Sequence, residues 1–242
     1  MKTNRSMTMG IMATTTEEAL PPLAPQQLLS LLYLASPSLP IGAFAYSGGL
    51  ESAIELGWVN DEACLIDWCQ GVMGEALGQL DVPVLLRLHR AWQDGDQSAI
   101  SHWNAFVRAN RETRELLFED EQLGSAMCRL LKGLERLPEW LPERPGFLTL
   151  YAATCVNFGI DARQAALTWL WSYLENQVAV ACKTIPLGQS KAQQVLMALM
   201  PHLEQVLARA ERLGDDELGA TLPGLAQASA WHETQYSRLF RS

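Results

Sequence analysis

Apolar residues recur at spacings of three and four along most of this chain of 242 residues, and no other feature constrains its fold as strongly. The pattern covers residues 65–80 behind Asp61, residues 166–181 behind Asp161, and residues 195–213. Such spacing places apolar side chains on one face of a helix, and aspartate is a favoured N-cap residue. No long stretch alternates apolar and polar residues as a half-buried strand would. The pattern predicts an all-α protein, a single-domain bundle of roughly eight to ten helices.

Breaks between the predicted helices give the domain organisation. Prolines indicate a loop at residues 137–146, and glycines with aspartates indicate another at residues 214–224, after a helix stop at Gly214. Shorter helices are expected at residues 26–35, 47–56, 83–92, 98–110, 112–134 and 147–158. The resulting division is a mobile N-terminal tail of residues 1–24, a helical domain of residues 25–226 and a C-terminal tail of residues 227–242.

Charge and cysteine content narrow the function classes. A net charge of −9 argues against a protein that coats nucleic acid or an anionic membrane surface, because both present phosphate groups. The five cysteines are scattered without a Cys-x-x-Cys pair, which favours a reducing, cytoplasmic location. No signal-peptide core is visible in residues 1–20, and prolines interrupt the uncharged stretch of residues 19–50. We expect a soluble protein with no nucleic-acid or membrane partner.

The common catalytic and cofactor motifs are absent from the sequence. There is no nucleotide-binding loop of either common type and no Gly-x-Ser-x-Gly elbow. The four histidines occur singly, without a second ligand at helical spacing. Methionines near the N-terminus could bind a soft metal, although no histidine or cysteine accompanies them. We therefore predict no catalytic residue, no stably bound cofactor and no metal site.

Three segments carry residues that a plain helical bundle does not require. Residues 36–51 combine prolines and glycines with the large rings of Phe44 and Tyr46, which either plug the core or form a rigid platform for a partner. Arg111 and Arg114 either form salt bridges along a helix, Arg111 with Glu115, or bind partner carboxylates.

The third segment surrounds Lys183, which lies among apolar residues at the end of a predicted helix. Its ammonium group could extend into solvent, cap the helix, pair with a buried carboxylate or bind another polypeptide. A catalytic lysine would need a lowered pKa and an acid–base partner, and the sequence shows no such partner.

Four motifs together resemble the UreF-type urease accessory proteins. They are LPIGAFAYSGGLE at 39–51, RETRE at 111–115, KTIPLGQ at 183–189 and HETQYSRLFRS at 232–242. Each motif alone is weak, but the four occur in the order and at the spacing of the family. The sequence departs from the family at Ala43 and Ala45, where small residues such as Gly and Ser are common, and at Trp231, where a basic residue is common.

The resemblance implies an all-helical, homodimeric, non-enzymatic chaperone in the cytoplasm. Such proteins bind UreD (UreH), recruit the GTPase UreG and dock on apo-urease, so that the complex handles nickel on its way to the urease active site. The segments around Tyr46 and Lys183 would serve the dimer and UreG, and the C-terminal tail from Trp231 would order against UreD. The partner-binding residues expected are Phe44, Tyr46, Arg111, Arg114, Lys183, Gln189, His232, Glu233, Tyr236, Arg238, Phe240 and Arg241.

Two alternatives remain open on the sequence. One is a helical-bundle enzyme that holds a small substrate or cofactor between its helices, with Lys183, Tyr46 or Cys182 as the reactive group. The other is a protein that carries nickel by itself, which the isolated histidines do not favour.

Overall fold

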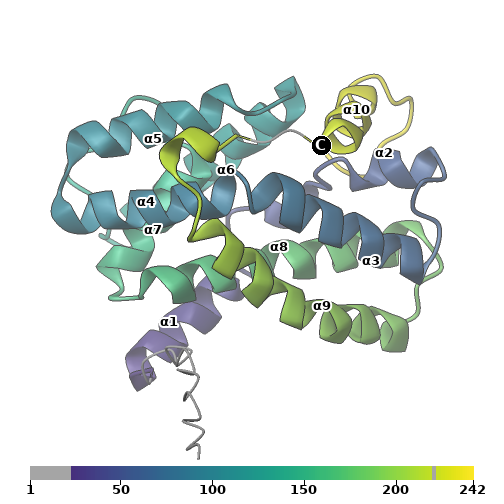
Figure 1. Ribbon diagram of the computed structural model, residues 1–242, viewed down its shortest axis with the longest axis horizontal. Coiled ribbons are helices and arrows are strands. Elements are labelled where there is room, and N and C mark those ends of the chain that lie inside the picture. The colour runs from purple at the N-terminus through teal and green to yellow at the C-terminus, as the bar shows by residue number, and fades with distance from the viewer. Residues whose placement is uncertain (1–22, 220–221) are drawn as a thin grey trace, which may run out of the picture.

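The computed structural model describes residues 23–219 and 222–242. In these ranges it contains ten α-helices, short 3₁₀ turns, one π-helical turn and no β-strand (Figure 1). This confirms the predicted all-α fold and the expected number of helices. Of the predicted N-terminal tail, residues 1–22 lie outside the described residues.

The helices follow the predicted ranges closely. The first or last residue of a helix differs from the prediction mainly where a capping residue or a glycine lies at that end. The bounds are α1 Pro25–Ala35, α2 Leu50–Glu55, α3 Glu62–Gly71, α4 Asp81–Asp94, α5 Gln97–Ala109, α6 Arg114–Gly133, α7 Phe147–Asn157, α8 Ala162–Thr184, α9 Gln189–Ala210 and α10 Pro223–His232.

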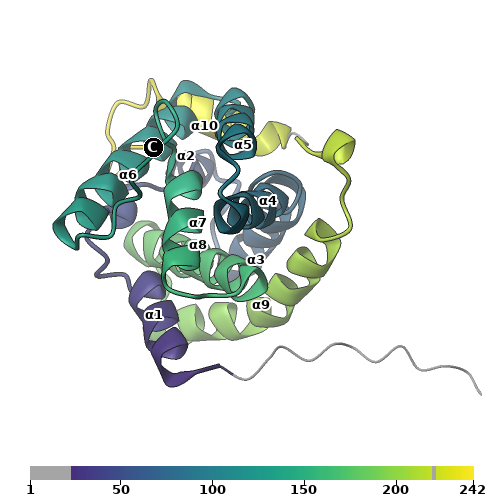
Figure 2. The ribbon, with the colours of Figure 1, turned by 90° about the vertical axis from the view of Figure 1, so that its left-hand side faces the viewer.

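Helix α4 lies at the centre of the bundle. It packs against α5, α7, α8 and α9, and Figure 2 shows it enclosed by the other helices. Eight of its 14 residues are buried, and they include all of residues 81–85 at its start. Arg90 and Asp94 are exposed, so the first half of α4 is covered on every face and the second half keeps one polar face in solvent.

Local capping accounts for several helix starts. Asp61 accepts a hydrogen bond from the Cys64 amide at 2.9 Å, and Asp161 accepts one from Arg163 and forms a capping box with Gln164. Both predicted N-caps are therefore confirmed. The predicted loop at residues 137–146 is also present as an irregular connection.

Three boundaries differ from the prediction. Helix α2 begins at Leu50 instead of residue 47, because Gly48 and Gly49 have positive φ angles of 58° and 84° that are incompatible with a helix. The helix predicted through residue 80 changes into a π-helical turn, η2 (Val72–Leu77), before α4 starts. Helix α9 ends at Ala210, so that the stop expected at Gly214 is wrong.

The contact between α6 and α7 depends on a glycine. A Cβ atom at Gly124 would lie 2.6 Å from the carbonyl oxygen of Pro145, closer than real Cβ contacts. Because the backbone of residue 145 approaches α6 this closely, the start of α7 is held against α6. This close approach positions Asp120 beside Gly146, the N-cap of α7.

The C-terminal region does not separate from the bundle at the predicted boundary. Helix α10 runs across it, from Pro223 to His232, and contacts α2 and α6. Residues 233–242 then return along the bundle as an irregular segment. None of the helices in the described ranges is long and apolar enough to span a membrane.

Candidate partner-binding site

Segments from three distant parts of the chain meet at one end of the bundle. They are the loop of residues 42–51 that leads into α2, the start of α6, and the tail of residues 232–242. Figures 1 and 2 both show α2, α10 and the last residue next to one another. The motifs at 39–51, 111–115 and 232–242 therefore form one region of the structure.

Glu51, on α2, joins the tail to the loop. Its side chain is buried and accepts hydrogen bonds from the backbone amides of Leu239 and Phe240, at 2.6 and 3.0 Å. It also faces Nε2 of His232, at 3.0 Å. A single carboxylate thus satisfies two backbone donors of the tail and one ring nitrogen of α10, which fixes the path of the chain after His232.

His232 has no solvent exposure and lies between two carboxylates. Its Nδ1 is 2.8 Å from Oε2 of Glu115, on the side opposite Glu51. A neutral imidazole has one donor and one acceptor nitrogen, whereas both nitrogens here face carboxylate oxygens. Both ring nitrogens are therefore engaged by carboxylate oxygens, from Glu51 on one side and Glu115 on the other. Arg238 adds a positive charge, at 2.9 Å from Oε1 of Glu115.

Backbone hydrogen bonds attach the end of the tail to the loop. The Ser47 amide donates to the backbone oxygen of Ser242 at 2.9 Å, and the Arg241 amide donates to the carbonyl of Ala45 at 2.8 Å. On the other side of the loop, side-chain amides of α8 donate to the carbonyls of Tyr46 and Ser47, both at 3.0 Å. The loop is therefore held between α8 and the tail.

Arg111 occupies a different position from the one expected. Helix α6 begins three residues later, and the Arg111 guanidinium forms two hydrogen bonds with Asp81 of α4, at 2.6 and 3.1 Å. It also lies 3.5 Å from Asp120. The expected salt bridge with Glu115 is wrong, because Glu115 faces His232 and Arg238.

The structure decides between two of the alternatives for Lys183. The residue is exposed at the end of α8, and no carboxylate lies within ion-pair distance of it among the described residues. Its Nζ lies 5.3 Å from the centre of the Phe240 ring, a cation–π distance. The lysine therefore contacts the tail instead of a buried carboxylate.

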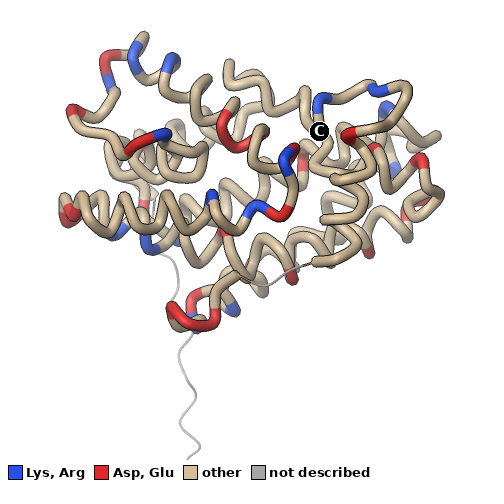
Figure 3. The backbone as a smooth tube through the Cα atoms, turned by 90° about the horizontal axis from the view of Figure 1, so that it is seen from above, with Lys and Arg blue, Asp and Glu red and all other residues tan. Residues whose placement is uncertain are grey.

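The predicted partner-binding residues divide into two groups. Tyr46, His232 and Phe240 are buried, Arg111 is largely buried, and all four contact this chain, so that partner binding there stays a prediction about the segments that carry them. The others that the structure leaves exposed are Phe44, Arg114, Lys183, Gln189, Glu233, Tyr236, Arg238 and Arg241. Figure 3 shows basic positions gathered around the end of the chain.

The carboxylates next to this region carry shifted pKa values. Burial, together with the neighbouring Asp120 and Glu115, raises the pKa of Glu119 to about 7, although Ser242 and Arg111 oppose the shift. Burial also raises the pKa of Asp120, against the opposing effect of Arg111. Burial lowers the pKa of Arg111, but Asp81 and Asp120 outweigh it and keep this pKa above its ordinary value.

Glu119 should make folding stability depend on pH. Because its pKa rises from 4.5 to about 7 on folding, the folded chain binds more protons than the unfolded chain between these values. We expect Glu119 to lower stability by as much as about 3 kcal/mol as pH rises through this window. Glu119→Gln, which cannot ionise, should remove that part of the slope in urea unfolding at pH 5 and pH 8. The exposed Glu139→Gln serves as control, and an unchanged slope in Glu119→Gln would contradict the assignment.

A sequence profile of the UreF family matches residues 59–200 of the chain. The urease accessory protein UreF of Chromohalobacter salexigens is 52% identical over 220 residues, which cover 90% of this chain and 96% of that protein. The chain belongs to the UreF family of urease accessory proteins. The UreF proteins of Hahella chejuensis and Pseudomonas putida are 50% and 46% identical, and the alignments cover 92% and 89% of this chain and 100% and 97% of theirs.

Membership of the UreF family confirms the resemblance and the prediction of a non-enzymatic protein. UreF proteins are urease accessory proteins, so that the alternative of a helical-bundle enzyme is wrong. Sequence reasoning about this UreF chain missed Glu51 and Glu115 as the anchors of the tail. One signal was available for Glu51, which is the first charged residue after a long uncharged stretch.

Proposed function

We propose that this UreF protein is a homodimeric cytoplasmic adaptor required for urease maturation. It bridges UreD (UreH) and the GTPase UreG on apo-urease, so that nickel is inserted into the urease active site. UreF itself binds no cofactor stably, and nickel is handled by the complex. Urease, UreD and UreG are its partners, without nucleic acid or membrane.

One observation carries this proposal: the loop of residues 42–51 and the tail of residues 232–242 form one surface. Glu51 and the backbone hydrogen bonds hold the two segments together, while Phe44, Tyr236 and Arg241 extend outward. A rigid surface with exposed aromatic and arginine side chains is typical of protein interfaces. An adaptor needs such a surface but needs no catalytic group.

The side chains of the described residues are compatible with nickel being handled by the complex. Among the described residues, no three His, Cys, Asp or Glu side chains are grouped so that they could hold a metal ion. Transfer of nickel within a complex is compatible with such a chain, because the tight metal site can belong to a partner. This also makes an independent nickel carrier the weaker explanation.

The decisive experiment uses exposed residues of the tail. Tyr236 is fully exposed and Leu239 is 71% exposed, so that Tyr236→Ala/Leu239→Ala leaves the interior unchanged. We expect this double variant to bind UreD at least about tenfold more weakly in co-purification and titration. In cells, it should lower the yield of active urease.

The matched control is Leu29→Ala/Met197→Ala, which removes exposed apolar side chains from α1 and α9. It should bind UreD like the unmodified chain. Normal urease activation by the tail variant would overturn the proposal. Removal of residues 231–242 is a poorer test, because it also removes His232 and Phe240 from the interior.

A further inference from the structure

A cavity of about 270 Å³ lies beneath the loop that carries Phe44. It is bounded by residues of α4, α6, α7 and α8 and by the segment after α1. The volume falls below the ~300–1,000 Å³ typical of pockets for drug-sized ligands. The cavity therefore suits one long side chain better than a cofactor.

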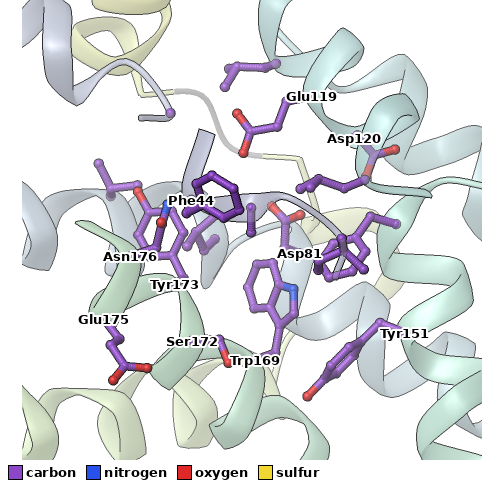
Figure 4. Close-up of a pocket in the computed structure, with 18 of the residues that line it drawn as sticks. Phe44, Asp81, Glu119, Asp120, Tyr151, Trp169, Ser172, Tyr173, Glu175 and Asn176 are labelled. Atoms are coloured by element: carbon purple, nitrogen blue, oxygen red, sulfur yellow. The ribbon is translucent and has the colours of Figure 1, made fainter. Parts of the chain in front are cut away.

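The walls of the cavity are mainly apolar and include aromatic rings. Figure 4 shows Phe44, Tyr173 and Trp169 around the same space. Phe44 is largely exposed, so that its ring stands at the border between the cavity and solvent. Aromatic faces attract cations, and the planar guanidinium group of arginine stacks on them particularly well.

The polar part of the lining is strongly acidic. In the view of Figure 4, the carboxylates of Glu119 and Asp81 point toward the ring of Phe44. The one cation in the described lining is Arg111, whose terminal nitrogens already contact Asp81 and Asp120. Five carboxylates and one guanidinium line the cavity, namely Asp81, Glu112, Glu119, Asp120, Glu175 and Arg111.

One acidic oxygen of the lining lacks a partner. Asp120 is 94% buried, and its Oδ2 makes no hydrogen bond within the described structure. This oxygen lies against Gly146 at the start of α7, so Asp120 contributes its negative charge to the cavity and not a free acceptor. No group of three metal-ligating side chains occurs among the described residues, which favours an organic cation over a bare metal ion.

We propose that this cavity binds the side chain of an arginine that a partner protein presents. The methylene groups would lie against the aromatic walls while the guanidinium faces the carboxylates of Glu119 and its neighbours. This site adds to the adaptor function a specific chemical requirement on the partner, namely an exposed arginine. The proposal does not depend on which maturation protein supplies that arginine.

The test is a titration of the isolated full chain with arginine amide, followed by the indole NMR signal of Trp169. Trp169→Phe identifies that signal. Citrulline amide, which has nearly the same shape without the charge, is the matched probe. We expect saturable binding of arginine amide with a Kd in the millimolar range and at least about tenfold weaker binding of citrulline amide.

Variants locate the site. Glu119→Gln should weaken arginine amide binding several-fold, and Glu175→Gln provides a second, more exposed variant if the first alters folding, as judged by circular dichroism. Glu139→Gln, at a residue that does not line the cavity, should leave the affinity unchanged. These measurements contain no UreD or UreG, so that their outcome is independent of the adaptor function.

Three results would overturn the proposal. The first is equal affinity for arginine and citrulline amide, and the second is no saturation up to about 50 mM arginine amide. The third is an identical shift of the Trp169 signal with magnesium or nickel chloride at equal ionic strength, which would indicate a general cation site.

Discussion

Replacing His232 with alanine is expected to lower the free energy of unfolding of this UreF protein by about 3–5 kcal/mol. The substitution leaves Glu51 and Glu115 buried and opposite each other, without the ring nitrogens that lie at 3.0 and 2.8 Å from their oxygens. Removal of one partner from a buried ionic cluster costs far more than the loss of a surface ion pair. Urea unfolding, followed by far-UV circular dichroism, measures the change.

Two further variants distinguish the electrostatic effect of removing the His232 side chain from the effect of its lost volume. His102→Ala removes an exposed histidine and should change stability by less than about 0.5 kcal/mol. His232→Ala/Glu51→Gln neutralises one of the facing carboxylates, so that its loss should be smaller than the sum of the single losses. Additive losses would show that the cluster is not coupled.

The tail should respond before the whole chain unfolds. Glu51 accepts hydrogen bonds from the backbone amides of Leu239 and Phe240. Repulsion from Glu115 would displace Glu51 and break both hydrogen bonds. Amide hydrogen exchange of residues 238–241 should therefore be faster in His232→Ala under native conditions. Exchange at the unmodified rate would mean that the backbone bonds of Ser47 and Ala45 suffice.

Arg111→Ala is the second substitution with a large expected effect, also about 3–5 kcal/mol. The guanidinium bridges Asp81 on α4 to Asp120 on α6, and both carboxylates are buried. Without it, the start of the central helix α4 and the first half of α6 would carry uncompensated charge. Urea unfolding at pH 7 gives the difference directly.

The geometry of the pair predicts an intermediate effect for Arg111→Lys. A lysine retains the charge but cannot form the two parallel hydrogen bonds with Asp81. Arg90→Ala is the matched control, because Arg90 pairs with Asp94 on the surface at 3.7 Å and should contribute about 0–0.5 kcal/mol. Equal losses for Arg111→Ala and Arg90→Ala would contradict the internal role of Arg111.

Helices and caps of this UreF chain were predictable because their signals are local. Asp61 and Asp161 act within three residues of their own positions, and apolar spacing reports on one face of one helix. The irregular connection at residues 137–146 follows from its prolines in the same way. The positive φ angles of Gly48 and Gly49 are also local, but glycine permits them without requiring them.

The internal ion pairs were not predictable from such local signals. Arg111 meets Asp81 across 30 residues, and His232 meets Glu115 across 117. Charged residues are mostly exposed in folded proteins, so a sequence alone does not indicate that a given one is buried. Only the tertiary structure shows which charged residues are buried together as ion pairs. The pairing of Arg111 with Glu115 was therefore wrong, whereas partner binding by Arg111 and Lys183 stays a prediction.

The contact between Glu51 and His232 also concerns the order of events during synthesis. The two residues are 181 positions apart, so that at about 5–20 residues per second the ribosome needs roughly 10–35 s to reach the second after the first. The loop of residues 42–51 lacks its contacts with the tail throughout that time, and α8 alone can hold it in the later part. Helices α3 to α9 can pair as they emerge, whereas this surface assembles only after translation has passed residue 240. A nascent UreF chain therefore completes its helical body before it completes the surface proposed here to bind its partners.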